Sequence, residues 1–193
     1  MPSGSTELTV MNKALILLGD REIVSRTDNS TRAKVMDAIY DGTRDRIMRE
    51  CPWNFATKQV NITKSTTYTV LFDFDSAYPL PADFLYMLRA ELDLSYRMQD
   101  NHILADETAV GTSGLNIEYV RRVEDMSTAD TLFVEALAYR LAYEACERIT
   151  ESNTKRDALL GEYELTMSRA KRLNGQEDFP QSFVEDAWVT ARL

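Results

Sequence analysis

The sequence Thr131-Leu-Phe-Val-Glu-Ala-Leu-Ala-Tyr-Arg-Leu-Ala-Tyr-Glu-Ala-Cys-Glu-Arg-Ile149 decides the fold class of this chain. Its apolar side chains recur at spacings of three and four in two neighbouring rows, which are Leu132, Ala136, Tyr139, Tyr143 and Cys146, and Phe133, Leu137, Leu141 and Ala145. A helix with so wide an apolar sector has to be covered on several sides. We therefore predict that residues 131–149 form the central helix of a bundle.

Three other segments have helical spacing of their apolar residues. They cover roughly residues 6–18, which end at Gly19, residues 30–51, which Pro52 stops, and residues 154–173, which Asn174-Gly175 stops. Ser127-Thr-Ala-Asp130 matches a capping box ahead of the central helix. Gly42, inside the second helix, indicates a close helix crossing or a kink. Trp53 and Phe55 follow a helix end, which favours a plug for the core, with a binding role as the alternative.

From Gln59 the apolar period changes from helical to two, which is typical of strands. Strands are predicted at Val60–Ile62, Tyr68–Phe72, Phe84–Leu94 and Leu115–Val120, with a hairpin turn at Asp100-Asn101. The predicted fold is mainly α with α+β character. It consists of a four-helix bundle made of residues 1–57 and 123–175, a small antiparallel β insertion at residues 58–122, and an extended C-terminal arm at residues 176–193.

The charge of the chain is acidic and uneven. The net charge is −9, and residues 58–120 alone carry nine acids against four bases. An acidic surface opposes tight binding to phosphate backbones, so a sequence-specific nucleic-acid reader is not expected, whereas a surface that DNA slides past is compatible. No membrane segment is predicted, because the longest apolar run, Ala14–Leu18, is too short to cross a bilayer.

Catalytic and metal-binding patterns are not found in the sequence. There is no glycine-rich phosphate loop, no Cys-x-x-Cys pair and no histidine-based triad, so we predict no catalytic residue, no metal and no cofactor. Asp73 and Asp75 could begin a calcium site, but the twelve-residue calcium loop does not follow. The single histidine, His102, reads as an ordinary surface residue, and the two cysteines read as small core residues.

The order of several motifs resembles the tail tubular protein A and head-to-tail adaptor family of tailed bacteriophages, especially the short-tailed ones. The motifs are Ala14-Leu-Ile-Leu-Leu-Gly19, Cys51-Pro-Trp-Asn-Phe-Ala56, Tyr78-Pro-Leu-Pro-Ala-Asp-Phe-Leu85, Ile117-Glu-Tyr-Val-Arg-Arg122 and Leu132-Phe-Val-Glu-Ala-Leu-Ala138. The match covers about residues 8–173. Each motif alone is weak, but their order and spacing together are fairly specific.

The resemblance implies a structural protein of the virion, made in the host cytoplasm. Such adaptors form a ring of subunits, commonly a dodecamer, between the portal protein and the tail tube or nozzle. The ring closes the filled head, and DNA passes through it during ejection without sequence-specific binding. The resemblance also implies a helical bundle with an inserted β-rich subdomain.

The C-terminal arm contains Phe179, Phe183 and Trp188 among acidic and small residues. Composition alone leaves open a docking arm, a disordered tail and a tail folded back on its own bundle. The resemblance favours docking on the portal or on a neighbouring subunit, with these three aromatics as the docking residues.

Two alternatives to the adaptor remain. One is a tail-associated enzyme that degrades polysaccharide or peptidoglycan, for which Glu144 with Glu147 or Glu151 could imitate a glycosidase pair, although helix carboxylates at this spacing usually form a solvated face. The other is a helical regulator or binding module of host origin. The order of the motifs favours the adaptor over both.

Overall fold

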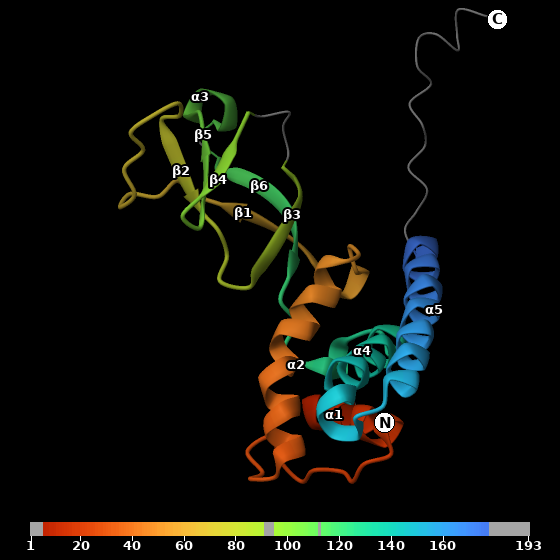
Figure 1. Ribbon diagram of the computed structural model, residues 1–193. Helices are drawn as coiled ribbons and strands as arrows, with labels where there is room; N and C mark the ends of the chain where they lie inside the picture. Colours follow the sequence, from red (N-terminus) through yellow and green to blue (C-terminus); the bar gives the residue numbers. More distant parts are fainter. Residues whose placement is uncertain (1–5, 91–94, 112, 178–193) are drawn as a thin grey trace, which may run out of the picture.

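The structure is a computed structural model, described for residues 6–90, 95–111 and 113–177 (Figure 1). The helices are α1 (Glu7–Leu18), α2 (Thr31–Arg49), the one-turn α3 (Glu107–Val110), α4 (Thr131–Thr150) and α5 (Asn153–Glu177). The strands are β1 (Thr57–Ile62), β2 (Ser76–Pro79), β3 (Phe84–Ala90), β4 (Arg97–Gln99), β5 (His102–Ala105) and β6 (Leu115–Arg121). Short 3-10 turns, η1 (Asn54–Ala56) and η2 (Met126–Thr128), lie where the chain enters and leaves the strands. Within the described ranges, no helix has both the length and the hydropathy needed to cross a membrane.

The helix α4 is the centre of the helical part, which consists of α1, α2, α4 and α5. It begins after Asp130, whose side chain accepts hydrogen bonds from the backbone N–H groups of Leu132 and Phe133. It packs against α1, α2 and α5, and α2 and α5 lie on opposite sides of it in Figure 1. Phe133 and Leu137 are fully buried. The prediction of a central, widely buried helix at residues 131–149 is therefore confirmed.

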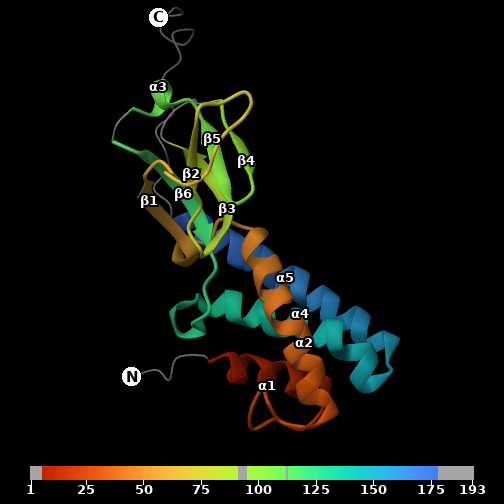
Figure 2. The ribbon, with the colours of Figure 1, turned by 90° about the vertical axis from the view of Figure 1, so that its left-hand side faces the viewer.

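The predicted four-helix bundle is wrong, because the fold is α+β. In a four-helix bundle the helices lie nearly antiparallel around one shared core. Here α1, α2 and α5 each pack chiefly on α4, and Figure 2 shows α2 crossing α4 at a steep angle. Strands complete the same core through Leu85 on β3 and Val120 on β6. The apolar pattern predicts which helix is central, but it does not predict the angles at which the neighbouring helices cross that helix.

The β part, residues 57–121, contains two three-stranded antiparallel sheets. The first sheet has the order β1-β6-β3 and the second sheet has the order β2-β5-β4. Both contribute to a second core, formed by Ile62, Tyr78, Ile103, Ala105, Val110, Leu115, Ile117 and Tyr119. The β4–β5 hairpin turns at Asp100 and Asn101, where φ is 49° and 55°. Positive φ at both central residues matches the twist of paired strands, so the predicted hairpin turn is confirmed.

Trp53 closes the end of the helical core, as predicted. Its side chain is 1% exposed, and its indole N–H donates to the carbonyl of Ile47 at 3.0 Å. Its ring and the Phe133 ring form a T-shaped pair at a centroid distance of 5.2 Å, a favourable arrangement for aromatic pairs. The residues after α2 therefore serve the core.

Two local predictions at helix ends are wrong, because the polar side chains involved have other partners. Ser127 does not cap α4, since it lies in η2, where its N–H donates to Asp125. Asn174-Gly175 does not stop α5, which runs on through both residues. The Asn174 side chain binds Asn54 instead of capping its own helix.

Candidate docking surfaces

Residues 63–75 form a loop over the outer face of the second sheet. The Tyr68 ring lies 4.2 Å from the ring of His102 on β5. His102 faces away from the second core, because its neighbour Ile103 points into that core. The strand predicted at residues 68–72 is therefore wrong: its alternation arises from a loop that lies on a sheet. His102 is half-buried beneath this loop, so it is more covered than the predicted surface residue, although its contact with the carbonyl of Asp100 is exposed.

The loop presents Leu71 and Phe72 to solvent, and we call these two residues the apolar tip. Their exposed fractions are 76% and 77%. The next residue, Asp73, has a φ of 66°, and the N–H of Phe74 donates across it to the carbonyl of Phe72 at 2.8 Å. A tight turn around a left-handed, non-glycine residue is strained. The Asp73 carboxylate also forms an exposed ion pair with Arg97 of β4 at 3.0 Å, which joins the loop to the second sheet.

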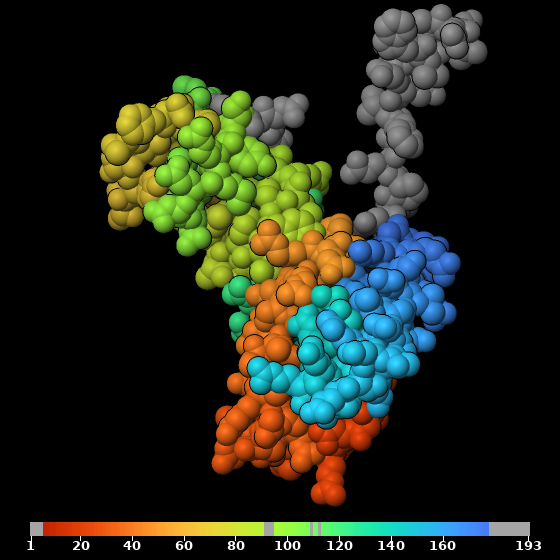
Figure 3. Space-filling view, in the orientation of Figure 1, coloured from red at the N-terminus to blue at the C-terminus, as the bar shows by residue number. Residues whose placement is uncertain are grey.

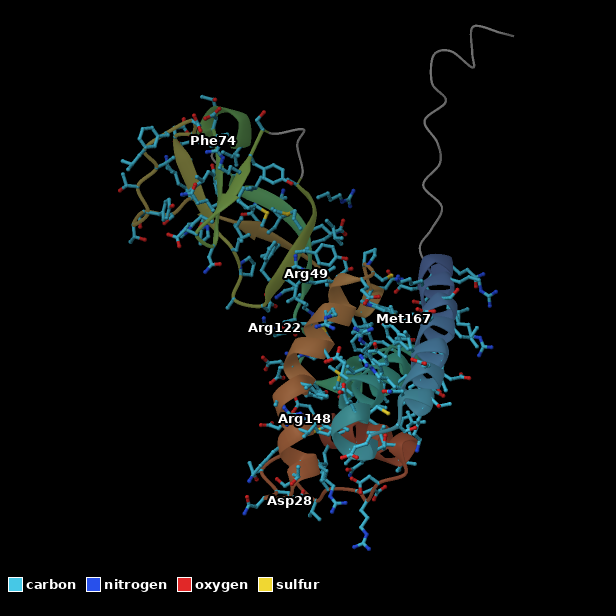
Figure 4. All side chains as sticks on the ribbon, in the orientation of Figure 1. Asp28, Arg49, Phe74, Arg122, Arg148 and Met167 are labelled. Carbon is cyan, nitrogen blue, oxygen red and sulfur yellow. The ribbon has the colours of Figure 1, made fainter. Side chains whose placement is uncertain are left out.

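The position of the apolar tip suits contact with another protein. Figure 3 shows the loop on the side of the β part that is remote from α5, and Figure 4 shows Phe74 at the α3 end of this part. Tyr96 and Met98, beside and on the edge strand β4, are each 42% exposed. Single exposed apolar residues are ordinary, whereas large contiguous apolar patches mark interaction surfaces. The apolar tip is therefore the first candidate docking surface.

The C-terminal end of α5 is held by a contact that we call the amide clamp, made by Asn54 and Asn174. The backbone N–H of Asn54 donates to Asn174 Oδ1 at 2.9 Å, and Asn54 Nδ2 donates to the carbonyl of Asn174 at 3.0 Å. Asn174 Nδ2 also donates to the carbonyl of Pro52 at 3.0 Å. The clamp thus ties the last turns of α5 to the connection that leads into β1.

A hollow of about 190 Å³ lies beside the amide clamp, with Phe55, Ala129, Ala170 and Leu173 among its lining residues. It is the second candidate docking surface, because Glu177, the last described residue before the arm, is one of its lining residues. The predicted docking residues Phe179, Phe183 and Trp188 lie outside the described residues, so the structure neither brings them together nor separates them.

The outer face of the first sheet carries a ladder of polar side chains along an open groove of about 510 Å³. Gln59 Nε2 donates to Glu118 Oε1 at 2.9 Å, and Arg89 Nε donates to Glu118 Oε2 at 2.5 Å. Asn61 Nδ2 donates to Asn116 Oδ1 at 2.8 Å. Because these groups bond to one another, the groove presents a surface whose polar side chains already have partners.

Glu144, a member of the possible glycosidase pair, has a structural role. Its carboxylate accepts a hydrogen bond from Thr43 Oγ1 at 2.8 Å and pairs with Arg46 at 2.7 Å and Arg140 at 3.0 Å. It therefore ties α4 to α2. The side chain of Glu147 is 75% exposed, as expected of a solvated face. The two carboxylates do not flank a cleft of the kind a glycosidase pair requires.

The carboxylates of the described ranges show no sign of a general acid. The pKa shifts resolved there all point downward, in Asp75, Asp83, Glu118 and Asp125. For Glu118 the largest cause is the hydrogen bond from Gln59. For Asp83 burial raises the pKa, but hydrogen bonds that include that of Tyr119 outweigh it. A glycosidase acid needs a raised pKa, so these groups suit ionised structural roles.

The described residues contain neither a metal-binding group of side chains nor a disulfide. Within residues 6–90, 95–111 and 113–177, no three or more His, Cys, Asp or Glu side chains are grouped to hold a metal ion. Asp75 Oδ1 accepts from the backbone N–H of Glu107 at 2.7 Å and from Ser76 Oγ at 2.8 Å, which is a loop-fixing role. Cys51 and Cys146 are both buried and are not joined by a disulfide.

Comparisons of this chain with protein-family models and with curated proteins find no match. They assign no family to the chain, and the similarity to the adaptor family remains a prediction from the order of its motifs.

Proposed function

We propose that this protein is a structural virion component, a head-to-tail adaptor that forms a ring between the portal protein and the tail tube or nozzle of a tailed bacteriophage. The family comes from the motif resemblance. The structural observation that carries the proposal is the apolar tip, in which Leu71 and Phe72 stand three-quarters exposed on a strained turn. An adaptor works by burying surface against other proteins, and adjacent exposed apolar residues are what such burial uses.

The order of the elements supports the same function. Along the described chain, two helices are followed by six strands, with the one-turn α3 between β5 and β6, and then by two long helices. This is the order implied by a helical body with an inserted β region. The loop of residues 63–75 and the end of α5 lie on different sides of the molecule (Figures 1 and 3). Separate surfaces suit a protein that contacts separate partners.

The charge of the chain suits a channel through which DNA passes. The net charge of −9 includes nine acids against four bases at residues 58–120. An acidic surface repels the phosphates of DNA, so DNA would not adhere to a channel wall made of such a surface. The proposed role is therefore passage of DNA without sequence-specific binding.

The proposal is tested by electron microscopy of the purified protein mixed with the portal protein of the same phage. We expect rings seated on the portal. A chain that stays monomeric and never associates with the portal would refute the adaptor function.

Deletion of residues 178–193 leaves the amide clamp in place. It should weaken the portal contact while far-UV circular dichroism stays unchanged. Unchanged portal affinity would contradict a docking role for the arm.

The enzyme alternative has its own test. Incubation of the purified protein with peptidoglycan or capsular polysaccharide should give no turnover if the protein is an adaptor. Turnover that a single Asp or Glu substitution abolishes would favour the enzyme instead. The lowered pKa values of Asp75, Asp83, Glu118 and Asp125 give this alternative no support.

A further inference from the structure

The last turns of α5 present an exposed side that combines apolar and basic residues. Its members are spaced i, i+4, i+7 and i+8 and therefore lie on one side of the helix: Leu165, Arg169, Arg172 and Leu173. We call these four residues the α5 face. The opposite side of the helix, which includes Met167, is buried in the helical core. The side chains of Leu165 and Leu173 are 46% and 45% exposed.

The α5 face carries positive charge that its own chain leaves unpaired. Residues 165–174 contain three bases and no acid. Lys171 pairs with Glu50 at 3.7 Å. Arg169 and Arg172 are exposed and have no ion-pair partner in the part of the chain that the structure describes. Like charges one turn apart on a helix repel each other, so an acidic partner would stabilise this face.

The apolar tip has the complementary composition. Leu71 and Phe72 are followed by Asp73, and residues 68–79 contain two acids and no base. Both side chains of the ion pair between Asp73 and Arg97 are exposed. Exposed pairs contribute little to stability, so the Asp73 carboxylate can exchange its partner. Two adjacent apolar side chains beside an acid thus match two leucines with arginines between them.

The charges favour one of the three ways in which two copies of the chain could meet through these surfaces. Tip against tip would bring the Asp73 carboxylates of both copies together, and face against face would oppose four guanidinium groups. Tip against α5 face instead sets opposite charges across from each other. The two surfaces lie on different sides of the molecule (Figure 3). A contact between different surfaces is head-to-tail, and it forms a ring when the rotation between copies closes.

We propose that the apolar tip of one copy docks on the α5 face of the next copy. The inference rests on the proposed function, since it names the surfaces through which neighbouring subunits of the ring meet. The tip packs on Leu165 and Leu173, and Asp73 pairs with a guanidinium group of the face. The contact is small, but a ring repeats it in every subunit and joins the binding of all subunits to the portal. Loss of the tip therefore weakens portal binding together with self-association.

Sedimentation velocity of the full chain measures this contact. The parent should form species larger than the monomer in low salt, and added salt should weaken them by screening the charges. Arg172→Glu should weaken self-association about tenfold or more, because it places like charges across the contact. Lys34→Glu is the matched control, since it makes the same change of charge at an exposed residue of α2 and should leave self-association unchanged.

A mixing experiment identifies which surfaces meet. The double variant Leu71→Ser, Phe72→Ser keeps an intact α5 face, and Arg172→Glu keeps an intact tip. At a concentration at which the parent is assembled, each variant alone should be monomeric. An equimolar mixture should form dimers and nothing larger, because one of the two contacts that a chain of subunits needs is intact. Far-UV circular dichroism checks that both variants are folded.

A parent that stays monomeric in low salt at every concentration would overturn the contact. Variants that assemble as well as the parent, or a mixture that stays monomeric, would overturn it too. Rings of Arg172→Glu seated on the portal would also overturn it, but they would leave the adaptor function standing. Self-association through these two surfaces in a chain that never binds the portal would have the opposite meaning: the contact stands and the adaptor function fails.

Discussion

Replacement of Asn174 by alanine is expected to destabilise the join between α5 and the β part. The Asn174 side chain accepts a hydrogen bond from the backbone N–H of Asn54 at 2.9 Å and donates one to the carbonyl of Pro52 at 3.0 Å. The first of these contacts is partly buried, so the N–H of Asn54 loses a partner where water has limited access. Alanine retains the helix and removes both contacts.

The size of the effect follows from these two bonds. A net intramolecular hydrogen bond contributes about 0.5–1.5 kcal/mol, so the loss of two costs about 2 kcal/mol. The higher helix propensity of alanine offsets roughly 0.6 kcal/mol of this loss. The expected decrease in the free energy of unfolding is therefore about 1.4 kcal/mol, which is about tenfold in the unfolding equilibrium constant.

Urea unfolding monitored by tryptophan fluorescence measures this change. The chain has two tryptophans, so the background should carry Trp188→Phe and leave the buried Trp53, close to the clamp, as the reporter. Gln176→Ala is the matched control, because it changes an exposed residue on the same turn of α5 and should stay within about 0.5 kcal/mol of the parent. An Asn174→Ala variant as stable as that control would refute the assignment of the clamp as a stabilising contact.

Gly42→Ala should raise the free energy of unfolding by about 1 kcal/mol, because a Cβ added inside α2 meets no atom within 4 Å. A lower free energy of unfolding in chemical denaturation would contradict the open surroundings of this glycine. The double variant Leu71→Ser, Phe72→Ser should change stability by less than about 0.5 kcal/mol, since both residues are exposed, yet weaken binding to the portal or tail partner in a pull-down titration; undiminished binding of both partners would exclude the apolar tip as a docking surface. Asp83→Asn should make stability less sensitive to acid. The folded pKa of Asp83 is lowered, as burial is outweighed by hydrogen bonds such as that from Tyr119, so its contribution is present above the unfolded pKa of about 3.9 and is lost as the pH falls through the folded pKa. Denaturation midpoints at pH 6 and pH 3 measure the difference, and an identical loss in parent and variant would contradict it.

Local sequence rules sufficed where a residue's partners lie within its own element. At the start of α1 the side chain of Thr6 accepts from the backbone N–H of Thr9, and at its end Gly19 has a φ of 75°. Both follow from neighbours in sequence. The same holds for the Asp100-Asn101 turn. The central helix was also predictable, because its two apolar rows record burial on several sides.

Sequence-based predictions were wrong at polar or small residues whose role depends on the rest of the fold. Such a residue either contacts a segment far away in sequence or makes no close contact at all. Asn174 followed by glycine is a common helix stop, but its amide binds a segment 120 residues away in sequence. Ser127 belongs to a turn instead of a cap. Gly42 suggested a close helix crossing or a kink, and its open surroundings show that no close crossing is present there. In each case the role of the residue depends on whether a segment distant in sequence packs against it. The local spacing of residue types does not reveal such a neighbour.

The apolar tip had a signal in the sequence that the strand prediction passed over. The alternation from Tyr68 to Phe72 indicates a strand, yet Leu71 and Phe72 are adjacent. In an extended strand, adjacent residues point to opposite faces, so one of the two would leave the buried face. Asp73 directly after them makes continued pairing less favourable still. Adjacent large apolar residues at the end of an alternating run, followed by aspartate, therefore mark a loop that presents them.

Residues 1–57 carry eight acids and eight bases, and this even balance gives no hint that one of the charges is buried. The Arg44 side chain is 4% exposed and pairs with Asp45 at 2.9 Å and Asp41 at 3.1 Å. Loss of either partner would leave part of a buried charge without compensation, which is costly. The other oxygen of Asp45 accepts from Nε of Arg122 at 2.8 Å. The network thus continues from α2 to the residue that directly follows β6.

The join between the helical part and the β part therefore rests on polar contacts at several places. Besides the pair of Asp45 with Arg122 and the amide clamp, Arg49 Nη1 donates to the carbonyl of Leu85 at 3.2 Å; Figure 4 shows Arg49 and Arg122 at this junction. If the apolar tip and the arm dock on different proteins, any freedom at the join has to be lost on docking and weakens binding. Contacts that restrict the join before docking reduce that cost. This gives the polar residues of the junction a role in docking although none of them is expected to touch a partner.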